Sequence, residues 1–275
     1  SVFGNNINFK LYPIKINSSG NNLDEVTFVG GGSFFSLDRL KATNNFAQNG
    51  TIINLETTQK MNYNKPGATD TSGYANEQAI IFENGKKCTL FDARFKSGVT
   101  NKLERKNSYS DGNGFTLYRY NKAGGLLNGE NYNIGAYIYM MGTNFSVNSY
   151  YLRSGKLIYK DILKNKEKVL LSNVVAFVIK YGVDSNGDGS VDTYNNTEED
   201  FYKIKTLTIG AVVKSPIKER EKNGECIITK NNLVKLGSDT VDLNALVGGD
   251  WSCYRYRAFE EEVELRNIRW LPKIS

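Results

Sequence analysis

The sequence contains no histidine. Histidine is the usual general base near neutral pH and the commonest zinc ligand in proteins. Its absence therefore excludes Ser-His-Asp hydrolysis, Cys-His proteolysis and metal catalysis with histidine ligands. Carboxylate, lysine or tyrosine chemistry is what remains open to an enzyme, and we expect a protein without catalytic activity.

Proline, cysteine and long apolar runs are also scarce. The 275 residues include 4 Pro and 3 Cys, against 26 Gly. No apolar run reaches the roughly 18 residues of a membrane-spanning helix, and no charged and then apolar leader opens the chain. Nothing in this sequence is thus expected to span or target a membrane.

The excess of positive charge is small. There are 35 Lys and Arg against 29 Asp and Glu, which gives a net charge of +6. The lysine-rich stretch 156–168 could contact phosphates, but a solvated strand-and-turn surface is the simpler interpretation. We predict no specific nucleic-acid partner.

What the sequence has in quantity is β-forming residues and turn residues, with 17 Tyr and 14 Phe among them. Short alternating apolar and polar runs are separated by Asn, Gly and Ser clusters, which predicts a mainly β fold of antiparallel sheets with hairpins and few short helices. A Ser154-Gly155 turn predicts a hairpin over 150–159. Short helices are expected at 37–45 and at 242–247, the latter capped at 238–239. The predicted strands are 8–16, 25–29, 78–83, 88–94, 114–120, 135–141, 149–153, 156–160, 174–181, 205–213, 225–229 and 254–269.

The densest chemical signal is an acidic loop directly after an apolar strand. Its oxygen-bearing residues stand in the order of an EF-hand-like calcium loop, with a glycine where the chain must turn sharply. Calcium takes about six to eight oxygen ligands, and alternate residues of such a loop can supply them. The candidate ligands are Asp184, Asn186, Asp188, Ser190 through its backbone carbonyl, and Asp192.

Two interpretations of this loop stay open. The position of the closing bidentate glutamate is taken by Asn195, and a strand rather than a helix precedes the loop. Glu198, Glu199 or Asp200 would have to complete the calcium shell. Alternatively, the Asp and Asn side chains cap the loop's own backbone without a metal ion.

The same segment resembles a known family. Residues 181–194 read Tyr-Gly-Val-Asp, two residues, Gly-Asp-Gly, two residues, Asp, one residue and Tyr, which is similar to a signature of PilW-type minor pilins of type IV pili. These are related to the J-type pseudopilins of type II secretion. The hairpin 150–159, the strand 204–213 and the segment 257–267 agree in order with that family, so that the resemblance covers roughly residues 78–270.

The resemblance implies a structural subunit of a type IV pilus, active in assembly or tip display. Its partners would be other pilins or minor pilins, and the inner-membrane pilus assembly machinery reached through an N-terminal helix. That helix is expected to be missing here, and counting it would make the fold α+β. We therefore expect residues 1–275 to be a single exported head domain, with 1–75 a poorly matched lead-in or small lobe. The expected location is the cell surface, in an extracellular pilus that is membrane-anchored before assembly.

An exported pilin meets oxidising surroundings, so a disulfide is expected among the three cysteines. Cys226 with Cys253 is the preferred pair because both lie in the late β segments, and Cys88 would then be a buried thiol on a strand. Pairing of Cys88 with either partner stays open. A zinc site with three cysteines would need a fourth ligand, and no Cys-x-x-Cys pair supports it.

The alternative function is a secreted carbohydrate-binding or adhesive β-sandwich module. Trp251 and Trp270 would be its candidate sugar platforms, although two lone tryptophans also suit a core. A glycosidase is the weaker option. It would use Glu260, Glu262 and Glu264, which alternation places on one face of a strand.

Overall fold

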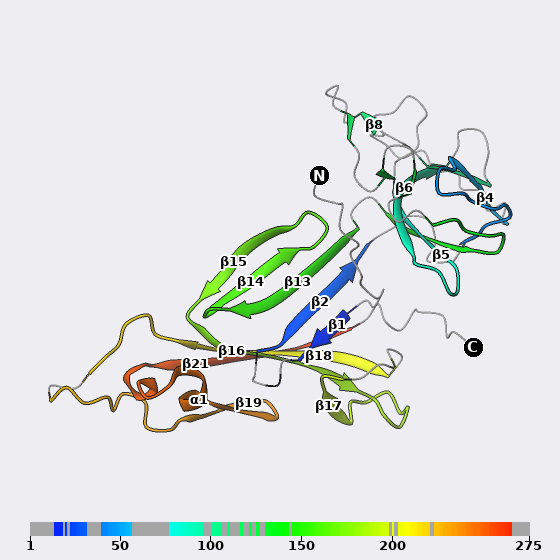
Figure 1. Cartoon of the computed structure of the whole chain (residues 1–275). Coiled ribbons are helices and arrows are strands. Elements are labelled where there is room, and N and C mark those ends of the chain that lie inside the picture. Colours follow the sequence, from blue (N-terminus) through cyan, green and yellow to red (C-terminus); the bar gives the residue numbers. More distant parts are fainter. Residues whose placement is uncertain are drawn as a thin grey trace, which may run out of the picture. The chain divides into compact units, whose positions relative to one another are not determined.

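The structure is a computed structural model of the chain, shown in Figure 1. The described residues are mainly β, as predicted, with antiparallel pairing between the named strands. They are residues 14–18, 20, 23–31, 40–56, 77–95, 101–105, 109–110, 116–117, 121–122, 125–126, 130–142, 145–197, 200, 203–220 and 223–265.

The chain divides into two compact units. The first unit consists of residues 1–10 and 30–146, and the second of residues 11–29 and 147–275. Strands from the expected lead-in 1–75 are therefore shared between both units.

The first unit contains a six-stranded antiparallel sheet with the strand order β3-β12-β5-β6-β7-β4. Its buried core includes Ile53, Ile81, Phe91 and Ile138. Two small ribbons, β8–β9 and β10–β11, belong to the same unit. The strands are β3 (Leu40–Lys41), β4 (Ile52–Asn54), β5 (Glu77–Phe82), β6 (Thr89–Phe95), β7 (Lys102–Arg105), β8 (Tyr109–Ser110), β9 (Thr116–Leu117), β10 (Asn121–Lys122), β11 (Gly125–Leu126) and β12 (Tyr137–Gly142).

The second unit contains a five-stranded and a four-stranded sheet, which share a core. One has the order β1-β2-β13-β14-β15 and the other β17-β16-β18-β21. Ile16 and Val26 of the first sheet pack with Ile179 and Leu207 of the second in one buried cluster. The strands are β1 (Ile14–Asn17), β2 (Glu25–Gly30), β13 (Ser146–Arg153), β14 (Lys156–Asp161), β15 (Lys166–Ser172), β16 (Val174–Val183), β17 (Thr193–Asn195), β18 (Ile204–Lys214) and β21 (Tyr256–Glu264).

The opposite face of the four-stranded sheet is covered by a hairpin and a short helix (Figure 1). The hairpin consists of β19 (Leu233–Leu236) and β20 (Asp239–Asp242), followed by α1 (Leu243–Val247) and the 3-10 turn η1 (Trp251–Cys253). They form a second core with the buried residues Val178 and Val212. Among the described residues, no helix has the length and hydropathy needed to cross a membrane.

The predicted hairpin over 150–159 is confirmed. β13 pairs with β14 from Asn148 to Arg153, and the turn residues Ser154 and Gly155 have φ angles of 51° and 70°. A positive φ at both turn positions matches the right-handed twist of the strands, which explains the glycine. The short helix at 242–247 is confirmed as well.

Three local predictions are wrong. The segment 225–229 is not a strand; there Thr229 donates its backbone N–H to Ser252 O, so it is held against η1 rather than in a sheet. In the predicted helix 37–45, residues 40–41 pair instead with β12. The helix cap is Asp242, whose carboxylate accepts from the backbone N–H of Asn244, whereas 238–239 belong to the β19–β20 hairpin.

Other predictions fall partly outside the described residues. These include residues 8–13 and most of 114–120, which were expected to be strands, and residues 37–39 and 266–269. The predicted strands did not include β3, β4, β7, β8, β10, β11, β15, β17, β19 or β20. β15 lies within and beyond the lysine-rich stretch and is exposed along its whole length, so that no apolar alternation marks it.

Candidate functional site

The acidic loop spans residues 184–192 and joins β16 to β17. Its base is narrow because Gly182, near the end of β16, has no side chain. A Cβ atom there would lie 2.0 Å from Thr206 Oγ1 on the neighbouring β18. Any larger residue would push the strands apart, so this glycine of the motif permits the close packing that holds the loop.

Asp184 anchors the loop from inside. Its side chain is 2% exposed, and its carboxylate accepts the backbone N–H of Gly187 at 2.6 Å and of Gly189 at 2.9 Å. Lys205 Nζ lies 3.1 Å from Asp184 Oδ2. Burial tends to raise the pKa of Asp184, but the hydrogen bonds from Lys205, Gly189 and Gly187 outweigh it and hold the pKa below its usual value.

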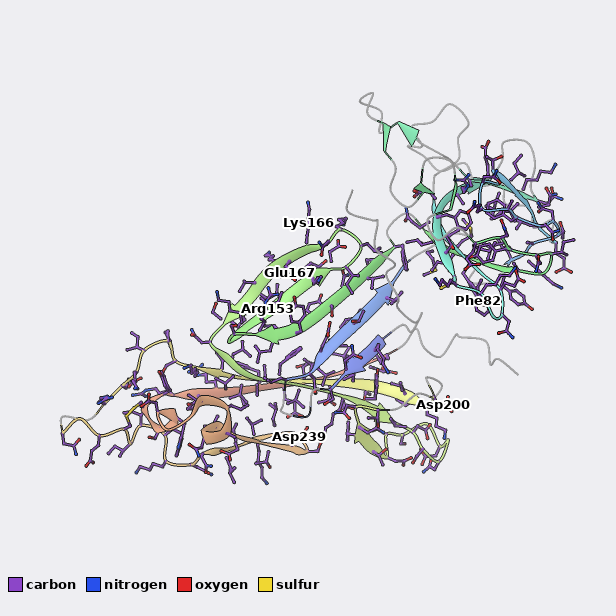
Figure 2. The ribbon with its side chains drawn as sticks, in the orientation of Figure 1. Phe82, Arg153, Lys166, Glu167, Asp200 and Asp239 are labelled. Carbon is purple, nitrogen blue, oxygen red and sulfur yellow. A yellow bond between two sulfur atoms is a disulfide. The ribbon has the colours of Figure 1, made fainter. Side chains whose placement is uncertain are left out.

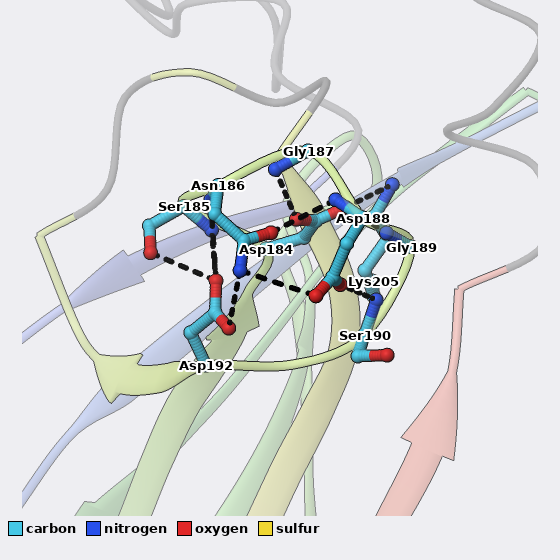
Figure 3. A network of polar contacts seen from close by, with 9 residues as sticks. All are labelled: Asp184, Ser185, Asn186, Gly187, Asp188, Gly189, Ser190, Asp192 and Lys205. Atoms are coloured by element: carbon cyan, nitrogen blue, oxygen red, sulfur yellow. Dashed lines mark hydrogen bonds and ion pairs between the residues drawn. The ribbon is translucent and has the colours of Figure 1, made fainter.

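The middle of the loop consists of two side-chain-capped turns. Asn186 Oδ1 accepts the backbone N–H of Asp188 at 2.8 Å, and Asp188 Oδ1 accepts that of Ser190 at 2.8 Å. Asn186 Nδ2 also donates to Asp188 Oδ2 at 3.1 Å. Figure 3 shows these contacts as one continuous network.

Asp192 closes the loop on its return. Its Oδ2 atom accepts from the backbone N–H and the hydroxyl of Ser185, both at 2.8 Å, and from the backbone N–H of Asn186 at 3.2 Å. The hydroxyl bond from Ser185 and the N–H of Asn186 lower the pKa of Asp192 despite some burial. The ionised carboxylate is thus the form that the loop stabilises.

The structure brings the four predicted ligand side chains into one network, and Ser190, predicted as a carbonyl ligand, joins it through its backbone N–H. The contacts themselves are those of a self-capping loop. In the described part of the chain, the carboxylate oxygens of Asp184, Asp188 and Asp192 do not all lie within 4.8 Å of one another, the spacing at which three ligand atoms could share one ion. Ionised carboxylates repel one another, and here backbone N–H groups and, at Asp184, the ammonium group of Lys205 compensate them.

Two described residues bear on the end of the proposed calcium loop: Asn195, at the position of the closing glutamate, and Asp200, one of the three residues expected to complete the shell. Asn195 lies in β17 opposite Tyr181, and its Oδ1 atom accepts from the backbone N–H of Thr197. Asp200 is exposed, while Glu198 and Glu199 lie outside the described residues. Each carboxylate of the loop still offers further lone pairs, since an ionised carboxylate has about four acceptor sites.

Two residues that matter here were not singled out from the sequence. Lys205 reaches Asp184 only because β18 pairs with the end of β16, with Gly182 opposite Thr206. Tyr181 of the motif is buried, and its hydroxyl accepts the backbone N–H of Ile16 at 2.8 Å and lies 3.3 Å from the Ile14 carbonyl oxygen. No spacing in the sequence could relate positions 165 residues apart.

A disulfide joins Cys226 and Cys253 in the structure, with their Cα atoms 4.4 Å apart. Asp250 lies beside these two sulfurs, so that the three residues form a group with metal-ligand spacing. However, the sulfurs are bonded to each other, and Asp250 pairs with Lys218 at 2.6 Å. Cys88 belongs to the first unit and is exposed just before β6, so the expectation of a buried thiol on a strand is wrong.

The one tryptophan among the described residues, Trp251, gives little support to a sugar-binding surface. Trp251 is half-buried and packs against the core under α1. A sugar platform needs an exposed ring face, and this ring is used for packing. Trp270 lies outside the described residues.

Residues 139–267 match the family model PilW, described as type IV pilus-assembly protein W. This segment is similar to the PilW family. Comparison with curated proteins and with solved structures gave no match. The match confirms the resemblance read from the sequence over residues 139–267, and the matched family is described as one of type IV pilus assembly.

The matched segment includes the acidic loop, the strands β16, β18 and β21, and the disulfide. β1 and residues 25–29 of β2 precede the matched segment in sequence, yet they belong to the second unit together with residues 147–267 of the match. The hydrogen bond from the backbone N–H of Ile16 to the hydroxyl of Tyr181 attaches β1 to the matched segment. The N-terminal segment thus completes the core of the unit that carries the family match.

Proposed function

We propose that this chain is a minor pilin: a non-catalytic structural subunit that takes part in type IV pilus assembly or in display at the pilus tip. The observation that carries the proposal is the PilW match over residues 139–267. The absence of histidine supports a structural role, because it removes the commonest catalytic base. Other pilins, and the inner-membrane assembly machinery, are its proposed partners, and the extracellular pilus is its proposed location.

The role as a subunit is tested by deleting the gene in the source organism and restoring it. We expect fewer surface pili after deletion, recovery with the restored gene, and this chain in sheared pilus fibres by mass spectrometry. Normal piliation after deletion would contradict a role in assembly. Normal assembly with the chain confined to the membrane fraction would contradict a role as a pilus subunit.

We further propose that the acidic loop binds calcium and is stabilised by it. The order of oxygen-bearing residues from Asp184 to Asp192 supports this, and so do the carboxylates' remaining acceptor sites. A cation at the loop would relieve the repulsion between Asp184, Asp188 and Asp192. Because it would bind the folded loop, it would stabilise the fold by about 2.7 kcal/mol at one hundred times its dissociation constant.

Thermal unfolding with calcium and with a chelator tests this proposal. For a unit of this size we expect calcium to raise the midpoint by roughly 5–10 °C. Asp188→Asn keeps the hydrogen-bond acceptor but removes a charge, and it should reduce the shift. Glu225→Gln, a matched change at an exposed residue of the same unit, should retain the shift. An unchanged midpoint, with no heat of binding by calorimetry, would refute calcium binding but leave the proposed pilin role intact.

A further inference from the structure

A small pocket lies on the face of the four-stranded sheet that carries the β19–β20 hairpin. Its volume is about 170 Å³, below the roughly 300–1,000 Å³ of pockets for drug-sized ligands. Its floor includes Val178 and Leu236, and its polar wall includes Tyr194, Glu260 and Glu262. We call it the acidic pocket. Figure 2 labels Asp239, which contributes to its rim from the hairpin.

Strand alternation and two glycines create this pocket. Glu260 lies opposite Gly210 and Glu262 opposite Thr208, so both glutamates share one face of the edge strand β21, as predicted. A Cβ atom on Gly210 would lie 2.6 Å from Leu236 Cγ, and one on Gly237 would lie 2.5 Å from Glu260 Oε1. Glycine at these positions lets the hairpin, the sheet and the Glu260 carboxylate approach one another closely.

The charges in the pocket are not balanced. Lys180 Nζ lies 2.7 Å from Asp239 Oδ1 and 3.1 Å from Ser238 Oγ, so this cation is already paired. Within the described part of the chain, neither Glu260 nor Glu262 forms an ion pair with a cation. One lysine and three carboxylates leave the pocket with a formal charge of −2, on a protein whose net charge is +6.

Two hydroxyl groups donate to the carboxylate of Glu262. Glu262 Oε1 accepts from the hydroxyl of Tyr194 at 3.0 Å and from that of Thr206 at 2.6 Å. Burial, the hydrogen bond to Glu262 and the charges of Glu262 and Glu260 raise the pKa of Tyr194, which reports a negative local field. Thr208 Oγ1 is a buried hydroxyl oxygen without a hydrogen-bond partner, and it lines the same pocket.

We propose that the acidic pocket binds the cationic end of one lysine or arginine side chain presented by another protein chain. The apolar floor would take the methylene stem, and Glu260 and Glu262 would bind the ammonium or guanidinium group. The small volume suits a single side chain. This inference rests on the proposed function, since a pilus subunit must contact neighbouring chains, and it names one such contact.

The test uses the isolated full chain, so that its outcome does not depend on pilus assembly. The probe is Nα-acetyl-lysine N-methylamide, titrated into ¹⁵N-labelled protein and followed by NMR at the backbone amides of Thr208, Gly210 and Gly237. We expect saturable shifts at these amides that weaken as salt is added, because surface charge pairs are screened. Glu260→Gln and Glu262→Gln should each weaken binding by up to about fivefold.

The matched control is Glu261→Gln. Glu261 lies on the same strand but faces the opposite side, opposite Ile209, and its neutralisation should leave probe binding unchanged. Equal binding of the Nε-acetylated, uncharged probe would overturn the proposal, as would equal losses in the Glu261→Gln and Glu262→Gln proteins. If calcium rather than the probe shifts these amides, the pocket binds a metal ion. If a free diamine binds more tightly than the probe, the pocket binds a small amine. Either result would overturn the proposal that its ligand is a side chain of another protein chain. A failed titration beside normal incorporation into pili would refute the pocket but not the proposed function.

Discussion

Replacing Tyr181 with phenylalanine removes a single oxygen from the core of the second unit. That hydroxyl accepts the backbone N–H of Ile16 and lies within hydrogen-bond distance of the Ile14 carbonyl oxygen, and the side chain is 1% exposed. Phenylalanine fills nearly the same space, so the change leaves the apolar packing in place. It also leaves a buried N–H group of β1 without this acceptor.

The expected cost follows from that buried donor. A buried polar group that loses its hydrogen-bond partner costs about 1–3 kcal/mol. With a urea m-value of about 2 kcal/mol/M, the unfolding midpoint should fall by roughly 0.5–1.5 M. Trp251 lies in the second unit, so its fluorescence follows the unfolding of the unit that contains Tyr181.

Tyr151→Phe provides the matched control. Its hydroxyl donates to Glu167 at 2.7 Å, and Arg153 lies 2.6 Å from the same carboxylate; Figure 2 labels Arg153 and Glu167. Water can replace this bond, so the loss should stay below about 0.5 kcal/mol. The reasoning is refuted if the Tyr181→Phe protein is as stable as the Tyr151→Phe protein.

Two further predictions concern the acidic loop and the disulfide. Folding lowers the pKa of Asp192, so its contribution to stability is present above its unfolded pKa of about 3.9 and is lost as the pH falls through the folded value. Asp192→Asn should therefore lower the free energy of unfolding at pH 7 and flatten its dependence on pH between pH 6 and 2. Parallel stability curves for the two proteins would contradict this. Replacing Cys226 and Cys253 together by serine should cost about 3–4 kcal/mol from loop closure over a separation of 27 residues, measured by urea unfolding, whereas Cys88→Ser in the other unit should leave the second unit's midpoint unchanged.

Local patterns in the sequence predicted much of the secondary structure. The apolar run over 174–181, the alternation over 205–213 and the Ser154-Gly155 turn each depend on neighbouring residues alone, and β16, β18 and the β13–β14 hairpin confirm them. The predictions at 40–45 and 225–229 were wrong because partners distant in sequence decide those segments. Residues 40–41 pair with β12, and residue 229 bonds to the backbone of residue 252.

The candidate site divides in the same way. The sequence by itself determined which oxygen-bearing side chains share the acidic loop, because they are separated by only one or two residues, and it determined that Glu260 and Glu262 share a strand face. Only the tertiary structure decided that Lys205 compensates Asp184 and that Tyr181 holds β1. It also pairs Lys180 with Asp239, which leaves Glu260 and Glu262 without an ion pair among the described residues. These contacts depend on the strand order of the second unit and on its hairpin. Both arise from the burial of apolar faces between distant segments, which the spacing of residues along the chain does not contain.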